Sequence, residues 1–325
     1  MITYRLSIIF FIIISLFFCA AEVQSAIRNV TDQVGRKITL SDNPQRIVSL
    51  APSITEIIFA IGRKDRLKGV TRFSDFPPEA AKLPRVGSYT QLKLERILAL
   101  KPDICIGVRD GNPPTIIHTL EALNLPVYMV DPGNLNEVMK TILEIGDLLN
   151  ADEAAKAVVH DMEARISRIK SLAAKAPYHP RVFFQIGINP VVSVGTDTFI
   201  HELITYAGGK NLSEGPTLYP RLNREQVLAM SPEVFVITSM ARGEIFQKVK
   251  IEWSRWTAIP AVRDKRIFVL DSNLFDRPTP RLADGLELLF RLIHPEIKED
   301  NADNVDNVGW VERSGTHHFT KTNEK

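Results

Sequence analysis

Hydrophobic positions along this chain fall into short continuous runs that alternate with stretches of helical spacing. In the first half the apolar runs lie at 46–50, 102–108 and 126–130, and helical spacing occupies 53–61 and 113–123. The second half repeats the pattern, with runs at 181–187, 233–237 and 266–270 and a helical stretch at 198–207 that ends before Gly208 and Gly209. Strands that alternate with helices predict parallel sheets covered by helices, which is the α/β class. Ser53, three residues before Glu56, is the expected N-cap of the first helix.

The two halves are separated by a stretch with strong helical character. Residues 152–174 contain no Gly or Pro and are rich in Ala, Glu, Lys and Arg, so they predict one continuous helix about 35 Å long. Such a helix makes a rigid connector, in contrast to a Gly-rich hinge. We therefore expect two similar α/β lobes joined by a single long helix, with a ligand cleft between them. The expected boundaries are an N-terminal lobe at 26–133, a connecting helical segment at 134–175, a C-terminal lobe at 176–296 and a disordered polar tail at 297–325.

An internal repeat supports two similar lobes. Glu95–Ile106 reads ERILALKPDICI and Glu225–Val236 reads EQVLAMSPEVFV, and a tyrosine lies six residues before each copy, at Tyr89 and Tyr219. The alternative is a chance recurrence, because helix, proline and apolar strand often follow one another in α/β proteins. The matching tyrosines and glutamates favour duplication.

The first 25 residues have the pattern of a secretory signal peptide. An apolar run from Leu6 to Phe18 follows Arg5, and small residues lead to Ser25, where cleavage is expected. An uncleaved anchor is the alternative, although the run is short for a membrane span. Lipid attachment at Cys19 is disfavoured, because the bulky Phe18 stands where lipoprotein signals have a small residue.

Composition narrows the class of partner and the kind of chemistry. After cleavage Cys105 is the only cysteine, which excludes an internal disulfide, and the formal net charge of +2 does not indicate a nucleic-acid partner. No metal site is expected, since the only close pair of histidines, His317 and His318, lies in the polar tail.

A secreted enzyme is the rival class, and the sequence offers little for catalysis. Ser193 lacks the glycines of a nucleophile elbow, and Gly208-Gly209-Lys210 lacks the first glycine and the hydroxyl of a phosphate-binding loop. We therefore predict no catalytic residue and no cofactor.

The duplicated residues are the candidates for function. Loops that follow strands form the ligand site of open α/β sheets, so Tyr89 and Tyr219 are expected to face each other across the cleft and to suit a large flat ligand. The alternative is that each ring packs on its own lobe. Glu95 and Glu225 lie in the first turns of their helices, where a carboxylate interacts favourably with the helix dipole. Two equivalent carboxylates also suit docking to a two-fold symmetric partner that carries cations.

Together these segments resemble the periplasmic cobalamin-binding proteins of vitamin B12 ABC importers, a family whose two lobes are joined by one long helix. The resemblance spans about residues 46–292. The motifs that carry it are RIVSLAPSITE, FSDFPPEA, LERILALKPD, QIGINP, REQVLAMSP and FDRPTPR.

The resemblance implies roles that spacing alone does not supply. It implies a periplasmic protein, monomeric when free, that delivers a corrinoid to the membrane subunits of an importer. Glu95 and Glu225 would pair with arginines on those two subunits. The implied corrinoid contacts are Phe73, Tyr89, Tyr219, Asn273, Phe275, Asp276 and Arg277.

Departures from the family leave the ligand open. Tyr89 and Tyr219 stand where the family has tryptophan, and Val108, Val192 and Leu274 replace aromatic residues. A ferric siderophore or haem therefore remains an alternative to cobalamin, and a receptor that feeds a sensor is an alternative to import. Arg277 and Arg281 also have a structural interpretation, as surface ion-pair partners of Asp276 and Asp284.

Overall fold

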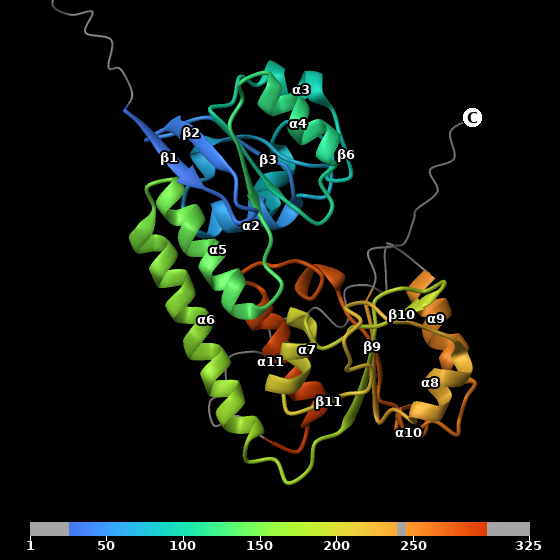
Figure 1. The fold of residues 1–325 in the computed structure, drawn as a ribbon. Coiled ribbons are helices and arrows are strands. Elements are labelled where there is room, and N and C mark those ends of the chain that lie inside the picture. The colour runs from blue at the N-terminus through green and yellow to red at the C-terminus, as the bar shows by residue number, and fades with distance from the viewer. Residues whose placement is uncertain (1–25, 239–244, 298–325) are drawn as a thin grey trace, which may run out of the picture.

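The chain folds into two α/β lobes connected by a long helix (Figure 1). The structure is a computed structural model that describes residues 26–238 and 245–297. The predicted signal peptide and the predicted tail, apart from Ile297, lie outside the described residues.

The N-terminal lobe is built on a four-stranded parallel sheet. Its order is β4-β3-β7-β8, with β3 at Ile47–Ser49, β4 at Leu67–Gly69, β7 at Ile104–Val108 and β8 at Val127–Val130. The strands are short and almost wholly buried, which explains their continuous apolar runs. The other elements are the antiparallel pair β1 (Ile27–Thr31) and β2 (Lys37–Ser41), the helices α2 (Pro52–Ala60) and α4 (Pro114–Ala122), and the 3₁₀ turns η1 (Lys64–Arg66) and η2 (Pro78–Lys82).

The C-terminal lobe repeats this plan. Its parallel sheet has the order β11-β9-β13-β14, with β9 at Arg181–Gln185, β11 at Lys210–Asn211, β13 at Val234–Ile237 and β14 at Ile267–Val269. The helical elements are α7 (Phe199–Tyr206), α9 (Ile245–Ser254), α10 (Pro260–Arg263), η3 (Ser272–Leu274) and α11 (Leu282–Ile293). In both sheets the first strand along the chain lies between the second and the third, so the two lobes share one topology.

The sequence repeat occupies equivalent places in the two lobes. In the first, the hairpin of β5 (Gly87–Ser88) and β6 (Gln91–Leu92) leads into α3 (Leu94–Ala99) and then β7. In the second, the antiparallel pair of β10 (Val191–Val192) and β12 (Arg221–Leu222) leads into α8 (Arg224–Met230) and then β13. The repeat thus reflects equivalent structure, and the prediction of two similar lobes is confirmed.

Two antiparallel helices make the connection between the lobes. Figure 1 shows α5 (Leu135–Leu148) and α6 (Asp152–Ala173) side by side, with α6 running from the edge of the N-terminal lobe along the side of the C-terminal lobe. The predicted long helix is confirmed, because α6 buries one stripe of apolar residues: Ala155, Val159, Met162, Ile166, Ile169 and Ala173. One apolar core continues from the N-terminal sheet through this helix pair to the C-terminal sheet. Closing or opening the cleft would have to shear this packing, so we expect small motions between the lobes.

One local prediction is wrong. Helix α2 has Ala51 as its N-cap and Pro52 in its first turn, whereas Ser53 is buried within the helix and does not cap it. Proline at the first helical position needs no N–H partner and already has the helical φ, so it begins this helix without a side-chain cap.

Candidate ligand-binding site

The loop after β7 supports the first of the two candidate tyrosines. The side chain of Asn112 is buried and donates from Nδ2 to the carbonyl oxygens of Leu50 (2.9 Å) and Tyr89 (2.8 Å). Its Oδ1 accepts from the backbone N–H of Val108 at 2.8 Å. Asn112 therefore ties the β5–β6 hairpin, which carries Tyr89, to the carboxyl edge of the parallel sheet.

The ring of Tyr89 lies directly over Gly111. A Cβ atom built on Gly111 would stand 2.6 Å from Cε2 of Tyr89, and the φ of Gly111 is +119°. Only glycine satisfies both the backbone conformation and the contact. The half-buried Tyr89 is thus fixed at the N-terminal side of the cleft, beside Asp110.

Tyr219 belongs to the C-terminal lobe and is 44% exposed. Burial of its hydroxyl raises the pKa of Tyr219, and the negative charges of Asp110 and Asp276 raise it further. Asp110 is on the N-terminal lobe and Asp276 on the C-terminal lobe, so the Tyr219 hydroxyl lies where the two lobes face each other. The structure thereby places Tyr219 near acidic residues of both lobes, and contact of Tyr89 and Tyr219 with a ligand stays a prediction.

The segment that follows β14 contributes the other C-terminal candidates. Asn273 is half-buried in η3, and Asp271 Oδ1 accepts its backbone N–H. Asp276 accepts a hydrogen bond from Thr238 Oγ1 at 3.2 Å, and burial raises the pKa of Asp276 to about 7. A carboxyl group at this pKa exchanges between donor and acceptor forms near neutral pH.

The prediction for Phe275 is corrected by the structure. Its side chain is fully buried and packs edge-on against Phe184, with ring centroids 5.6 Å apart. The ring therefore belongs to the core of the C-terminal lobe and does not reach a ligand.

Arg277 and Arg281 form ion pairs that cross between the lobes. Arg277 Nη1 lies 2.8 Å from Glu56 Oε1, and Arg281 Nη1 lies 3.5 Å from Glu56 Oε2. Glu56 is on α2 of the N-terminal lobe and is almost fully buried. Burial raises the pKa of Glu56 in spite of the two guanidinium groups that favour its charged form. The expected pairing with Asp276 and Asp284 is therefore wrong.

A loop of the N-terminal lobe, residues 73–76, also contacts these two arginines. Arg277 Nη2 donates to the carbonyl oxygen of Phe73 at 3.0 Å, and its Nη1 lies 3.5 Å from Asp75. The Arg281 guanidinium lies 3.9 Å from the ring centroid of Phe76. The ring of Phe73 itself is half-buried. Arg277 thus holds the loop that carries Phe73, while its direct contact with a ligand stays a prediction.

The two candidate docking residues occupy equivalent surface positions. Glu95 and Glu225 are exposed in the first turns of α3 and α8. Neither has an ion pair with any residue in 26–238 or 245–297. Both carboxylates are therefore available to a partner at the same place on each lobe.

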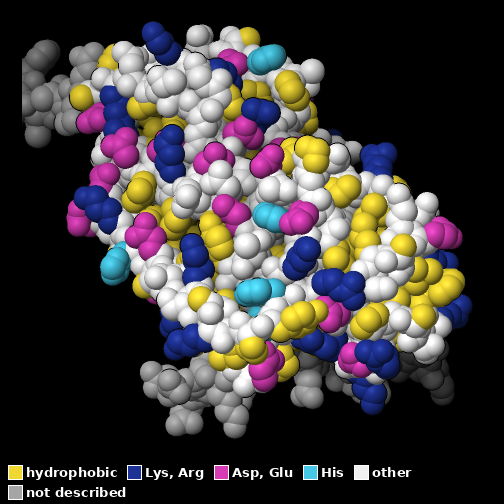
Figure 2. All heavy atoms as spheres, turned by 60° about the horizontal axis from the view of Figure 1, so that its bottom comes forward, with side chains coloured by type: hydrophobic (Ala, Val, Ile, Leu, Met, Phe, Trp, Pro, Cys, Tyr) yellow, Lys and Arg dark blue, Asp and Glu magenta, His cyan; other side chains and the backbone are white. Residues whose placement is uncertain are grey.

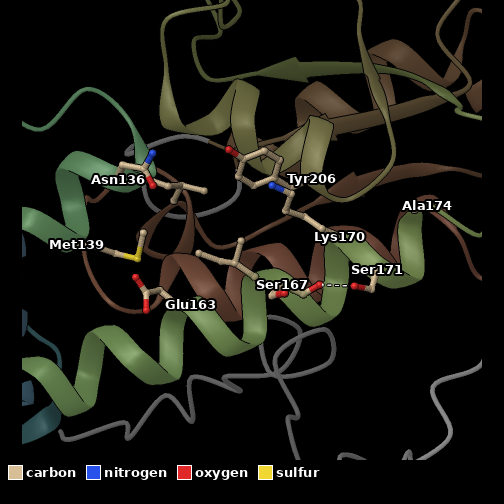
Figure 3. Close-up of a pocket in the computed structure, with 10 residues that line it drawn as sticks. Asn136, Met139, Glu163, Ser167, Lys170, Ser171, Ala174 and Tyr206 are labelled. Carbon is tan, nitrogen blue, oxygen red and sulfur yellow. Dashed lines mark hydrogen bonds between the residues drawn. The ribbon is translucent and has the colours of Figure 1, made fainter.

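Other features of the surface lie away from this cleft. A hollow of about 470 Å³ lies between α5, α6 and α7, where Lys170 approaches Tyr206 (Figure 3). Figure 2 shows basic and acidic side chains intermixed on the face that it presents. The part of the chain that the structure describes contains no cluster of three or more metal-ligating side chains, and none of its helices is long and apolar enough to cross a membrane. His317 and His318 lie outside the described residues.

Sequence reasoning missed three polar residues of the site. Asn112 and Asp110 occur in a loop whose composition indicates only a turn. Glu56 looked like part of a helix cap, although its partner Arg277 is 221 residues away in the sequence. The one indication in the sequence was that Asp110 and Asn112 directly follow a predicted strand, where ligand sites of α/β sheets form.

Comparisons with known proteins agree with this geometry. Residues 47–274 match the family model described as "Periplasmic binding protein". The chain is 32% identical over 256 residues to a vitamin B12-binding protein of Vibrio parahaemolyticus, an alignment that covers 77% of this chain and 90% of the relative.

Two solved structures show the same fold. The periplasmic vitamin B12 binding protein of Vibrio cholerae has a TM-score of 0.68 and 29% identity, with 79% of this chain and 99% of that chain covered. A periplasmic heme binding protein from Pseudomonas aeruginosa has a TM-score of 0.72 and 30% identity, with 78% and 94% covered. From its topology, its interlobe cleft and these matches, the chain belongs to the periplasmic binding protein family.

Proposed function

We propose that this protein is the solute-binding protein of an ABC importer, and that it captures a corrinoid, most directly cobalamin, between its two lobes. The observation that supports this proposal is that Tyr89 and Tyr219 occupy equivalent places in the two lobes, each just ahead of the strand and helix of the sequence repeat. Two aromatic rings and a few polar groups suit a large, flat and partly polar ligand. Relatives that carry the name vitamin B12-binding protein support this choice of ligand.

Delivery to a membrane permease is the second part of the proposal. The exposed carboxylates of Glu95 and Glu225 lie on equivalent helices of lobes with the same topology. A two-fold symmetric pair of membrane subunits with cationic docking residues would meet both lobes alike. Export to the periplasm would depend on the predicted signal peptide at 1–25, and the free protein would be monomeric.

Haem is the second candidate ligand, because a periplasmic heme binding protein is a structural neighbour at 30% identity. The two ligands differ at the rim of the macrocycle. Haem carries two carboxylates, whereas cobalamin carries neutral carboxamides. The relatives named vitamin B12-binding protein, at 31–32% identity, favour the corrinoid over haem.

Isothermal titration of the exported protein with cyanocobalamin, cobinamide, haem and a ferric siderophore tests the ligand. We expect one-to-one binding of the corrinoids and weaker or no binding of the other two. Binding of haem or the siderophore alone would overturn the corrinoid while leaving the transport role in place. No binding of any of the four would remove the support for a transport role and favour the sensor or enzyme interpretation.

A further inference from the structure

A second hollow in the surface lies beside helix α8, which carries the docking candidate Glu225. It has a volume of about 380 Å³ and lies between α8 and the end of α9, two neighbouring helices of the C-terminal lobe (Figure 1). Its lining residues are Arg224, Glu252, Arg255 and Trp256. Because Arg224 directly precedes Glu225 in the first turn of α8, the hollow is continuous with the surface that we propose for docking to the permease.

The hollow carries positive charge that the protein neutralises only in part. Arg224 Nη2 lies 3.6 Å from Glu252 Oε2, and both side chains are exposed. The guanidinium carbon of Arg224 also lies 5.9 Å from the ring centroid of the buried Trp253, so Arg224 connects α8 with α9. The exposed guanidinium of Arg255 has no ion pair or hydrogen bond with any side chain that the structure describes. Two arginines and one glutamate therefore leave a net positive charge in the lining.

Apolar surface adjoins these charges. Trp256 is 40% exposed where the chain turns after α9, and its backbone N–H donates to the carbonyl oxygen of Trp253 at 3.0 Å. Ile251 is 57% exposed, whereas Val249 and Trp253 of the same helix are buried in the core of the C-terminal lobe. Tryptophan and arginine are the residues that most often carry the binding energy of a protein interface. An exposed tryptophan next to an unpaired arginine therefore favours a protein partner for this hollow.

The N-terminal lobe has no counterpart of this arrangement. Leu94 occupies the position of Arg224 in the sequence repeat, and it is half-buried against the core of its own lobe. Residues 26–133 contain no tryptophan. The large hydrophobic side chains that α3 and the end of α4 expose are the aliphatic Leu98 and Leu123. The docking candidates Glu95 and Glu225 are thus equivalent, but their surroundings differ.

We propose that this hollow is a docking point for the membrane subunit that meets the C-terminal lobe, and that it receives a loop of that subunit in which a carboxylate lies beside an apolar side chain. The inference rests on the proposed function and adds the chemistry of the partner at one lobe. The positive lining selects a negatively charged partner, and continuity with Glu225 selects the permease. Arg255 pairs with the carboxylate, and Trp256 packs against the apolar neighbour. Docking is therefore stronger at the C-terminal lobe than at the N-terminal lobe.

The test is uptake of radiolabelled cyanocobalamin by spheroplasts of the source organism that lack their own copy of this protein. The full exported protein is added at increasing concentration, and the half-saturating concentration measures docking. We expect Trp256→Ala and Arg255→Glu each to raise that concentration about tenfold, because each removes an anchor of the interface. Isothermal titration should show unchanged affinity for cyanocobalamin in both variants.

Two variants of the N-terminal lobe are the matched controls. Leu123→Ala truncates a side chain that is 51% exposed directly after α4, the helix equivalent to α9. Lys64→Glu reverses an exposed charge in η1, on the lobe that does not contain the hollow. Both controls should keep the wild-type half-saturating concentration. A loss in Leu123→Ala equal to that in Trp256→Ala would contradict the inequality between the lobes.

The outcomes separate this inference from the proposed function. If Glu225→Arg raises the half-saturating concentration while Trp256→Ala and Arg255→Glu leave it unchanged, the hollow takes no part in docking and the transport function stands. A loss of ligand affinity in Trp256→Ala or Arg255→Glu would overturn the docking assignment. Sedimentation of the wild type as a dimer that Trp256→Ala dissociates would make a second copy the occupant and overturn it as well. If the wild type supports no uptake of cyanocobalamin, the proposed function fails and this inference fails with it.

Discussion

Removing the charge of Glu56 should destabilise the protein, because two arginines from the other lobe depend on it. In Glu56→Gln the amide oxygen can still accept from Arg277, but the amide nitrogen would face Arg281 as a second donor. Breaking a buried ion pair from one side typically costs about 3–5 kcal/mol.

Three features of this junction reduce that cost. Arg277 keeps the carbonyl oxygen of Phe73 and the carboxylate of Asp75, and Arg281 keeps the ring of Phe76. Burial already disfavours the charged form of Glu56, as its raised pKa indicates. We therefore expect a loss of about 2–3 kcal/mol in the free energy of unfolding.

The assay is unfolding in urea, followed by two spectroscopic probes. Trp253 and Trp256 lie in the C-terminal lobe, so with the third tryptophan replaced, Trp310→Phe, tryptophan fluorescence follows that lobe while far-ultraviolet circular dichroism follows the whole chain. Because Glu56 joins the lobes, the two transitions should separate in the variant and coincide in the wild type.

Glu153→Gln is the control for this experiment. Glu153 pairs with Lys156 at 2.9 Å on the exposed face of α6, and such surface pairs contribute little to stability. We expect no measurable change in the control. Equal unfolding midpoints for Glu56→Gln and Glu153→Gln would refute the interlobe role of Glu56.

Three other predictions follow from the cleft. Gly111→Ala places a Cβ 2.6 Å from the Tyr89 ring at a φ of +119°, so thermal unfolding should show a loss of about 1–3 kcal/mol and titration should show weaker ligand binding. The raised pKa of Asp276, about 7, means that the folded state holds this proton more tightly than the unfolded state. Stability should therefore fall from about pH 4 to pH 7 by about 3 kcal/mol, and Asp276→Asn should remove that part of the pH dependence in urea titrations. Charge reversal of Glu95 and Glu225 to Arg should abolish uptake in a transport assay with ligand affinity unchanged, and a parallel loss of affinity would contradict the docking role.

The sequence was most informative where a pattern is local. Helix α6 was predicted from a long stretch without Gly or Pro that is rich in Ala, Glu, Lys and Arg, and the two lobes from a repeat that recurs in equivalent elements. Tyr89 and Tyr219 were expected in loops that follow strands, whereas Tyr89 lies in the β5–β6 hairpin and Tyr219 just before β12, and their contact with a ligand stays a prediction.

Sequence patterns could not predict the contacts between residues that are far apart in the chain. No local pattern connects Glu56 with Arg277, whose separation is 221 residues, whereas Asp276 and Asp284, the partners of the alternative interpretation, lie close to the two arginines in the sequence. Asp284 instead lies 2.5 Å from Arg165 of the connecting helix. Phe275 was assigned to the ligand because the resemblance implied that its segment contacts a corrinoid, but the direction of a ring in a loop depends on packing that the sequence does not display.

The central claim is that a corrinoid binds between the lobes, against Tyr89 and Tyr219. The most direct measurement is titration of cyanocobalamin into the exported protein and into the double variant Tyr89→Ala, Tyr219→Ala, with circular dichroism to confirm that both are folded. The account predicts one-to-one binding by the wild type and a loss of at least about thirtyfold in the variant, since truncation of each aromatic contact that matters for binding costs more than about 1 kcal/mol. Unchanged affinity in the folded double variant, or no binding by the wild type, would contradict it.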